Sequence, residues 1–192
     1  MTAPNIIKET CEGTVCIPLR DALFQHREIH LYGEITQESA HGVIMQLRYL
    51  QSEAPSEGIT MYVSSPGGEV SSGLAVYDAM QAVSCPVRTV CIGMAASIAA
   101  ILFAAGDQRE ILPHARVMIH DPMVADGISG SALQIHNVAR DMMKTRETVG
   151  KIFARHTGHT LEEVLERTST DCYFNAEQAV AWGLADCVID RF

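Results

Sequence analysis

The stretch PVRTVCIGMAASIAAILFAAG, residues 86–106, decides the fold that this sequence predicts. Its first part, residues 86–93, has the continuous apolar character of a strand that is buried on both faces. Its second part, from Ser97 to Ala105, predicts a short helix that ends at Gly106. A buried strand that leads directly into a helix is typical of α/β domains, whose strands are mostly parallel.

The rest of the chain repeats this alternation of strand and helix. Further strands are predicted at residues 27–35, 59–65 and 116–120, and the stretch LADCVID predicts a closing strand. Helices are predicted after the caps Thr36, Thr160 and Asn175, over residues 69–83, and from about Ser131 to Arg155. The first fifteen or so residues have no clear period, and we expect them to be mobile. The pattern predicts one α/β domain over residues 1–192.

Composition and charge exclude several classes of protein. The chain has 192 residues, of which 47% are hydrophobic and 19% charged, so it can form a folded core. Its formal net charge of −9 disfavours nucleic acid and anionic membrane surfaces as partners. No apolar run approaches the roughly 20 residues of a membrane helix. The start, MTAPNIIKETCEG, lacks the pattern of a signal peptide, so we expect a cytoplasmic protein.

The cysteines and histidines do not predict a metal site. None of the 6 cysteines forms a C-x-x-C pair, and none of the 8 histidines belongs to an H-E-x-x-H motif. We expect the cysteines to be reduced thiols, as is usual for cytoplasmic proteins. Metal catalysis is therefore not expected.

Unusual residues follow three of the predicted strands. In open α/β sheets, sites form at the carboxyl ends of the strands. The three strand ends here carry the runs Ser65-Pro66-Gly67-Gly68, Gly93 to Ser97, and His120-Asp121. These positions are the candidates for a functional site.

Ser97 has two interpretations. Small residues surround it on both sides, namely Gly93, Ala95, Ala96, Ala99 and Ala100. Such neighbours would let a polymeric substrate approach the hydroxyl, which would act as a nucleophile if a base activated it. The alternative is an N-cap serine, whose hydroxyl only satisfies the start of the helix.

Gly67 and Gly68 also have two interpretations. Glycine tolerates positive φ and exposes its backbone N–H, so two aimed N–H donors could stabilise the oxyanion of an acyl transfer. The alternative is a tight turn in which the glycines are purely conformational. The residues alone do not choose between them.

His120 could present a nitrogen to a cleft as a general base, or it could simply bond to the backbone. The carboxylate that would orient its ring is open. Asp121 is its neighbour, but adjacent residues of an extended chain point to opposite faces. Asp171, Asp126 and Asp186 all remain candidates.

Several motifs together resemble the proteolytic subunit of the Clp protease, the ClpP family. They are SPGG (65–68), GMAAS (93–97), RVMIHDP (116–122), HTG (156–158) and AEQAVAWGLAD (176–186). The resemblance implies a serine endopeptidase, of the EC 3.4.21 class, on the ClpP/crotonase-like spiral of ββα units. It also implies a protruding handle helix, within a region of about 123–158, and an axial N-terminal segment at residues 1–18.

The same resemblance implies the assembly and the partners. Seven subunits would form a ring, and two rings would stack as a homo-oligomeric tetradecamer around a chamber. An AAA+ Clp ATPase would unfold protein substrates and feed them in, and ATP would be used by that partner. This chain would carry no cofactor. A second ClpP-type subunit is a further candidate partner.

Site residues follow from the resemblance position by position. Ser97 matches the nucleophile, His120 the general base and Asp171 the orienting carboxylate. The backbone N–H groups of Gly68 and Ile98 match the oxyanion donors. Positions that match substrate-binding residues are Gly68, Glu69, Val70 and Met123, and positions that match the ATPase docking pocket are Tyr62, Ala82 and Ile92.

Some positions depart from the family pattern and suggest a divergent member. The family usually reads His-Gln-Pro-Leu-Gly-Gly at the base, whereas this chain has Asp121 after His120 and a longer segment before the long helix. A Glu-Arg pair before the orienting aspartate is replaced by Ser169-Thr170, and an aromatic residue by Ala82. Asp121 places an added carboxylate near the base, and the altered segment after it matches the part that contacts both the substrate and the opposite ring. Ser169-Thr170 bears on ring stacking, and Ala82 bears on docking.

Two other functions remain as alternatives. One is a latent or regulatory ring subunit that works only beside a second ClpP-type subunit. The other is a crotonase-type acyl-CoA enzyme, since that class also uses glycine-rich N–H pairs as an oxyanion hole.

Overall fold

A mostly parallel sheet forms the centre of the chain. The structure is a computed structural model, and it describes residues 4–11, 13–124 and 127–192. The sheet has the strand order β3–β4–β5–β6–β9, with bounds β3 Glu28–Tyr32, β4 Ile59–Ser65, β5 Val87–Ala96, β6 Gln108–Ile111 and β9 Cys187–Val188. All these neighbours are parallel. Two further strands, β7 Arg116–Ile119 and β8 Cys172–Phe174, extend the sheet beside β5.

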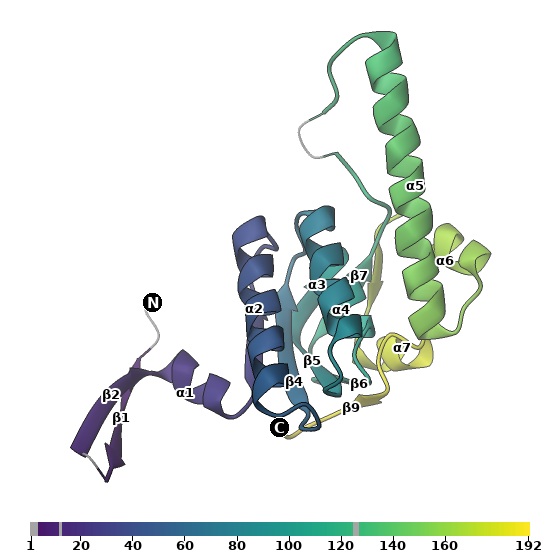
Figure 1. Cartoon of the computed structure of the whole chain (residues 1–192). Helices are drawn as coiled ribbons and strands as arrows, with labels where there is room; N and C mark the ends of the chain where they lie inside the picture. Colours follow the sequence, from purple (N-terminus) through teal and green to yellow (C-terminus); the bar gives the residue numbers. More distant parts are fainter. Residues whose placement is uncertain (1–3, 12, 125–126) are drawn as a thin grey trace.

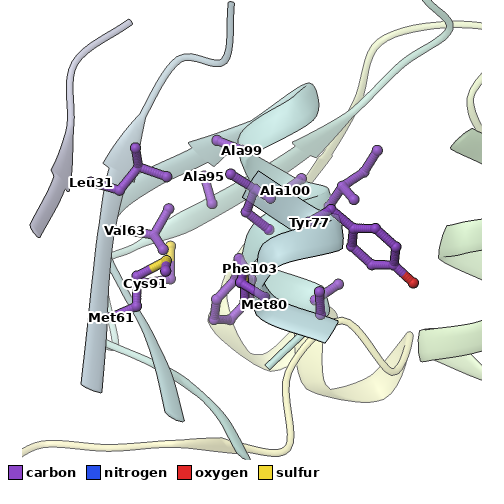
Figure 2. Close-up of a cluster of buried hydrophobic side chains, with 14 of the residues drawn as sticks. Leu31, Met61, Val63, Tyr77, Met80, Cys91, Ala95, Ala99, Ala100 and Phe103 are labelled. Atoms are coloured by element: carbon purple, nitrogen blue, oxygen red, sulfur yellow. The ribbon is translucent and has the colours of Figure 1, made fainter. Parts of the chain in front are cut away.

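Helices cover one face of the sheet (Figure 1). They are α2 Gln37–Glu53, α3 Val70–Ala82 and α4 Ile98–Ala104, and the remaining helices are α5 Ala132–Thr157, α6 Leu161–Arg167 and α7 Ala176–Ala181. Strand β4 alternates between buried and half-buried residues, so its odd-numbered side chains face the helices. Figure 2 shows Met61 and Val63 of β4 among Met80 of α3 and Phe103 of α4, within the core.

Strand β5 pairs with two different strands, one after the other. Its residues 88–91 pair with β6, and its residues 94–96 pair with β7. The change occurs near Gly93, which has a φ of 75°, and next to a register shift in the pairing with β4. The prediction of a strand over residues 86–93 was therefore too short, because the strand continues through the small residues to Ala96.

The long helix α5 projects from the body (Figure 1). Its 26 residues correspond to about 39 Å. Its buried residues, Val149, Gly150 and Phe153, all lie in its second half. A capping box of Ser131 and Gln134 starts the helix, and Gly158 ends it in the left-handed conformation. None of the helices in the described residues combines the length and apolar content of a membrane span.

The N-terminal stretch, whose sequence shows no clear period, forms regular structure. Strands β1 Asn5–Thr10 and β2 Gly13–Pro18 form an antiparallel hairpin, followed by helix α1 Leu19–Gln25. The hairpin stands apart from the sheet (Figure 1), and its described side chains are exposed or half-buried. Because no core periodicity is imposed on such a hairpin, the apolar pattern could not reveal it.

Candidate active site

The pairing of β5, β7 and β8 brings the three residues of the candidate site to one edge of the sheet. Ser97 follows β5, and His120 follows β7, which is parallel to β5. Asp171 precedes β8, which is antiparallel to β7 and pairs Cys172 with Ile119. The start of an antiparallel strand lies beside the end of its partner, so Asp171 lies next to His120.

Ser97 occupies a strained junction between β5 and α4. Its φ of 56° and ψ of −127° are unusual for a residue other than glycine. Its backbone N–H donates to the Met118 carbonyl at 2.9 Å, which fixes the junction on β7. The interpretation of Ser97 as an ordinary N-cap serine is wrong, because its side chain makes no capping hydrogen bond.

The His120 ring lies between the serine and the aspartate. Its Nε2 is 2.8 Å from Ser97 Oγ, and its Nδ1 is 3.4 Å from Asp171 Oδ1. The His120 side chain is 14% exposed, whereas that of Asp171 is 61% exposed. A ring protonated at Nδ1 faces the carboxylate with its N–H and leaves Nε2 to accept the serine proton.

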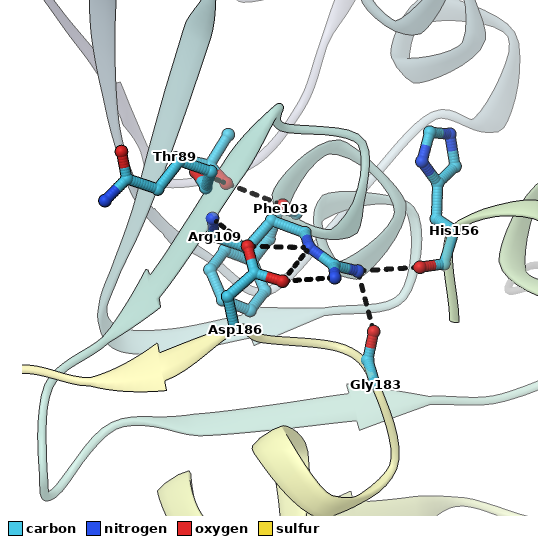
Figure 3. A network of polar contacts seen from close by, with 7 residues as sticks. Thr89, Phe103, Arg109, His156, Gly183 and Asp186 are labelled. Carbon is cyan, nitrogen blue, oxygen red and sulfur yellow. Dashed lines mark hydrogen bonds and ion pairs between the residues drawn. The ribbon is translucent and has the colours of Figure 1, made fainter. Parts of the chain in front are cut away.

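The other carboxylates that remained open have different partners. Asp186 directly precedes β9 and pairs with Arg109 of β6, and Arg109 also donates to the carbonyls of His156 and Gly183 at 2.7 Å each (Figure 3). Asp121 binds Arg146, and it is not the carboxylate at the His120 ring. Asp126 lies outside the described residues.

Gly67 and Gly68 pack the loop after β4 tightly against its surroundings. Gly67 has a φ of 98°, and a Cβ on it would lie 2.7 Å from Ser97 Cβ. Gly68 has a φ of 150°, and a Cβ on it would lie 2.2 Å from the Ile35 carbonyl oxygen. Both positions therefore require glycine for conformation as well as for space.

The hydrogen bonds of this loop distinguish the backbone N–H of Gly68 from those of its two neighbours. The Ile35 N–H donates to the Gly67 carbonyl, and the Glu69 N–H donates to the Ile35 carbonyl, both at 2.8 Å. In this parallel bridge between Ile35 and Gly68, the N–H of Gly68 itself faces away from Ile35. The Gly67 N–H is taken by Ser65 Oγ at 3.1 Å, so it differs from that of Gly68.

Ile98 is the first residue of α4, directly after Ser97. The first N–H groups of a helix have no acceptor within it. The Ile98 N–H therefore belongs to the same junction as the hydroxyl of Ser97. Of the two N–H groups that the resemblance assigns to an oxyanion hole, that of Ile98 follows Ser97 in the chain, and that of Gly68 follows Gly67, whose Cβ position lies against Ser97.

A small apolar pocket lies beside Ser97 and His120. Its other lining residues are Val70, Ile98, Ile101, Pro122, Val149 and Phe153. Val149 and Phe153 come from the buried half of α5, so the long helix forms one wall. Sequence reasoning missed these two residues as site residues, although their spacing of four on a helix indicated an inward face.

The predicted substrate-binding residues differ in their environment. Val70 lines the pocket, and Met123 is exposed in the segment that follows Pro122. Glu69 is exposed, and its carboxylate accepts hydrogen bonds from the hydroxyls of Ser72 at 2.7 Å and Ser71 at 2.8 Å, which lower the pKa of Glu69.

The predicted docking residues do not form one group within a single chain. Tyr62 and Ile92 lie on the sheet face opposite α3, because Tyr62 pairs with Val90 and side chains alternate along a strand. Ala82 is an exposed residue in the last turn of α3, on the other side of the sheet.

An aromatic cluster surrounds Tyr62. Its ring stacks on His30 at a centroid distance of 5.1 Å, and the ring of Phe192 meets it edge-on at 5.6 Å. Burial, with a smaller contribution from the charge of Glu28, raises the pKa of Tyr62. Tyr62 thus lies in an aromatic cluster with the charged side chains of Glu28 and Arg88 nearby.

Among the described residues, no group of three His, Cys, Asp or Glu side chains is placed to hold a metal ion. The cysteines there are all free. The donor set at the site, a hydroxyl, an imidazole and an exposed carboxylate, is that of nucleophilic catalysis.

An α/β sheet that presents a serine against a histidine at its strand ends has the arrangement of a serine hydrolase. The family model described as Clp protease matches residues 12–192. The chain therefore belongs to the Clp protease family, which is a family of serine peptidases, and its fold is the ClpP/crotonase-like α/β fold.

Proposed function

We propose that this chain is a self-compartmentalising serine endopeptidase that hydrolyses unfolded polypeptides with Ser97, His120 and Asp171. The observation that carries the proposal is the position of His120, whose Nε2 is 2.8 Å from Ser97 Oγ while its Nδ1 faces Asp171. A histidine in this position can take the serine proton, which a serine needs in order to act as a nucleophile.

In the first half of the reaction, Ser97 Oγ attacks the carbonyl carbon of the peptide bond. The hydroxyl proton passes to His120 Nε2, and the positive imidazolium is stabilised by the Asp171 carboxylate. The N–H groups of Gly68 and Ile98 donate to the oxyanion. His120 then protonates the leaving amine, and the acyl group stays on Ser97.

In the second half, water replaces the amine. His120 accepts a proton from the water, which attacks the acyl carbon, and the proton then returns to Ser97 Oγ as the acid leaves. The protein ends in its starting state. The reaction needs no metal or redox cofactor.

We infer that the substrate lies as an extended strand between Gly68–Val70 and the segment that contains Met123. Binding through the backbone tolerates many side chains, as a protease for unfolded proteins requires. The apolar pocket beside Ser97 has a volume of about 10 Å³ and supports a small apolar side chain at the residue whose carbonyl is attacked.

The assembly and the partners are proposed on the basis of the family. Heptameric rings of this chain would stack as a tetradecamer, with residues 123–158 as the handle between rings and residues 1–18 near the axis. An AAA+ Clp ATPase in the cytoplasm would supply unfolded protein and use the ATP.

We infer that the docking pocket needs two copies of the chain. Tyr62 and Ile92 lie on the sheet face opposite α3, whereas Ala82 lies on α3 itself. These positions could line one pocket only if neighbouring subunits each contributed a side. A ring would provide such a junction at every subunit boundary, and several weak contacts would then act together.

One observation favours a second candidate, the latent ring subunit. Asp171 is 61% exposed, so in the single chain its carboxylate competes with water for the His120 ring. Contacts from another subunit would strengthen this pair by excluding water. The crotonase-type alternative is not favoured, because the family match covers residues 12–192.

A fluorophosphonate probe tests the proposal. Ser97 Oγ displaces fluoride from phosphorus, its proton is taken by His120, and the covalent phosphonyl serine is detected by mass spectrometry. We expect labelling of the wild type and of Ser52→Ala, and none of Ser97→Ala. Absence of labelling in the assembled wild type contradicts the active peptidase, and labelling only after a second ClpP-type subunit is added supports the latent subunit.

A further inference from the structure

The residue after His120 is held by a network that the proposed mechanism does not use. Asp121 Oδ2 accepts a hydrogen bond from Arg146 Nε at 2.5 Å, and Asp121 Oδ1 accepts one from Thr168 Oγ1 at 2.7 Å. The Asp121 N–H donates to the Thr168 carbonyl at 2.8 Å. Arg146 Nη2 also donates to the Leu165 carbonyl at 2.7 Å. We call Asp121, Arg146 and Thr168 the Asp121 clamp.

The clamp joins the three parts of the chain that must meet at the candidate active site. Asp121 is adjacent to His120, and Thr168 lies three residues before Asp171. Arg146 lies on α5, one turn before Val149, which lines the apolar pocket. The network therefore ties the loop of the histidine, the loop of the aspartate and the long helix to one carboxylate.

Partial burial and the donor geometry of Arg146 strengthen the Asp121 clamp. The side chains of Arg146 and Asp121 are 23% and 31% exposed, so their ion pair is partly shielded from water. Thr168 is buried, and it is the C-cap residue of α6. Arg146 binds two acceptors on different segments, a carboxylate and a carbonyl, through two separate nitrogens of its planar guanidinium.

We propose that Arg146 and Thr168 are positioning residues of the peptidase, which act through Asp121 to hold the His120 ring between Ser97 and Asp171. The inference rests on the proposed function. Neither residue touches the substrate or the reacting atoms, so their loss should affect the rate of the chemical step and leave binding unchanged. A displacement of the histidine by about 1 Å can lower a rate about a hundredfold.

The test measures labelling by a fluorophosphonate with an apolar side chain, separating the limiting rate, kinact, from the binding constant, KI. The variants are Arg146→Gln, Arg146→Lys and Thr168→Val. For Arg146→Gln and Thr168→Val we expect kinact to fall about 10- to 100-fold with KI within twofold of wild type. Arg146→Lys keeps the charge but not the two-directional donors, so its kinact should lie between those of Gln and wild type.

Arg109→Gln is the matched control. Arg109 also pairs with an aspartate and donates to two backbone carbonyls, and its side chain is 15% exposed against 23% for Arg146, but Ser97 and His120 are not among its partners. We expect Arg109→Gln to lower the melting temperature and to leave kinact within about twofold of wild type. Melting and light scattering on every variant ensure that only folded, assembled protein is compared.

The outcomes separate the two proposals. If the wild type is labelled and kinact of Arg146→Gln equals that of Arg109→Gln, the positioning role is wrong while the proposed function stands. An increase in KI with unchanged kinact also overturns the positioning role. If the wild type is never labelled, the proposed function and the inference that rests on it both fail.

Discussion

At the scale of single residues, the site stores strain where Ser97 joins β5 to α4. A positive φ at a residue other than glycine costs on the order of 1–3 kcal/mol and persists only where the surroundings hold it. Here the surroundings are the whole of α4, every residue of which is buried. The small residues around Ser97 thus serve packing, because a Cβ on Gly67 would collide with Ser97 and with the Ala96 carbonyl oxygen.

Gly67→Ala tests how closely this packing fixes the serine. The new Cβ would lie 2.7 Å from Ser97 Cβ and 2.8 Å from the Ala96 carbonyl oxygen, so the serine must move. We expect peptide hydrolysis to fall at least about a hundredfold. Gly33→Ala is the control, because Gly33 has a similar φ of 80° with open space around it, and it should cost only about 1 kcal/mol of stability. Equal activity of the two variants would contradict the crowding of Ser97.

The apolar pocket predicts the preference of the proposed peptidase. The pocket has a volume of about 10 Å³, so it fits a methyl group and not a large side chain. Burial of one methyl group contributes about 0.8 kcal/mol, which corresponds to about fourfold in kcat/KM for alanine over glycine. Peptides that differ only in the residue before the cleaved bond measure this ratio. Val70→Asp should reduce the ratio, since Val70 lines the pocket. A preference for acidic or basic residues would show that substrates do not use this pocket.

At the scale of elements, the sequence predicted the helices and strands whose signals lie within their own few residues, such as an alternating apolar pattern or a capping residue. Strand β4 matches its prediction at both ends, and Thr36, Thr160 and Asn175 all cap helices as expected. The short strands β6 and β8 were missed, because three or four residues become a strand only through their neighbours.

The identity of the aspartate at the His120 ring also depends on contacts between distant segments. The residues alone left Asp171, Asp126 and Asp186 open, because the choice depends on the antiparallel pairing of β8 with β7. That pairing joins segments about fifty residues apart and leaves no periodic signal. Only the resemblance to a family selected Asp171. The Asp121 clamp was not predicted for the same reason. Arg146 is one of several charged residues on the polar face of the predicted helix, and nothing in the sequence indicates that it pairs with Asp121.

The C-terminal end of α5 predicts a pH dependence of stability. His156 Nε2 lies 3.1 Å from the Tyr77 hydroxyl, and burial, followed by the charges of Arg155 and Arg109, lowers the pKa of His156. The unfolded state, with a histidine pKa of about 6.5, then binds more protons than the folded state. The contribution of His156 to the free energy of unfolding is therefore present above about pH 6.5. It is lost as the pH falls from there through the pKa of His156 in the folded state.

Melting temperatures at pH 7.5 and pH 5.5 measure this contribution. We expect the melting temperature of His156→Gln to fall less between pH 7.5 and pH 5.5 than that of the wild type. His136→Gln is the control, because His136 is exposed on the projecting half of α5, and it should keep the wild-type loss. If His156→Gln loses as much as the wild type, His156 does not govern the dependence.

At the scale of the whole molecule, the projecting half of α5 needs a partner. Exposed apolar side chains gather on it and on the segment before it, namely Met123, Val124, Ile128, Leu133, Ile135, Val138 and Met143. Ile135, Val138 and Met142 follow the spacing of three and four that places residues on one helix face. An apolar stripe of this kind is typical of a contact surface and fits the proposed handle between two rings.

Val138→Asp tests this assembly. An unpaired carboxylate within an apolar contact carries a desolvation cost of several kcal/mol, and the contact is repeated at every subunit pair. We expect light scattering to report a particle of half the wild-type mass, a single ring. The melting temperature should be nearly unchanged, because Val138 is 39% exposed and lies outside the hydrophobic core of the described residues. Asn137→Asp adds the same charge one residue along, about 100° around the helix, and should keep the wild-type mass. If both variants keep it, the stripe does not join the rings, and the exposed side chains of Met123, Val124 and Ile128 become the remaining contact to be tested.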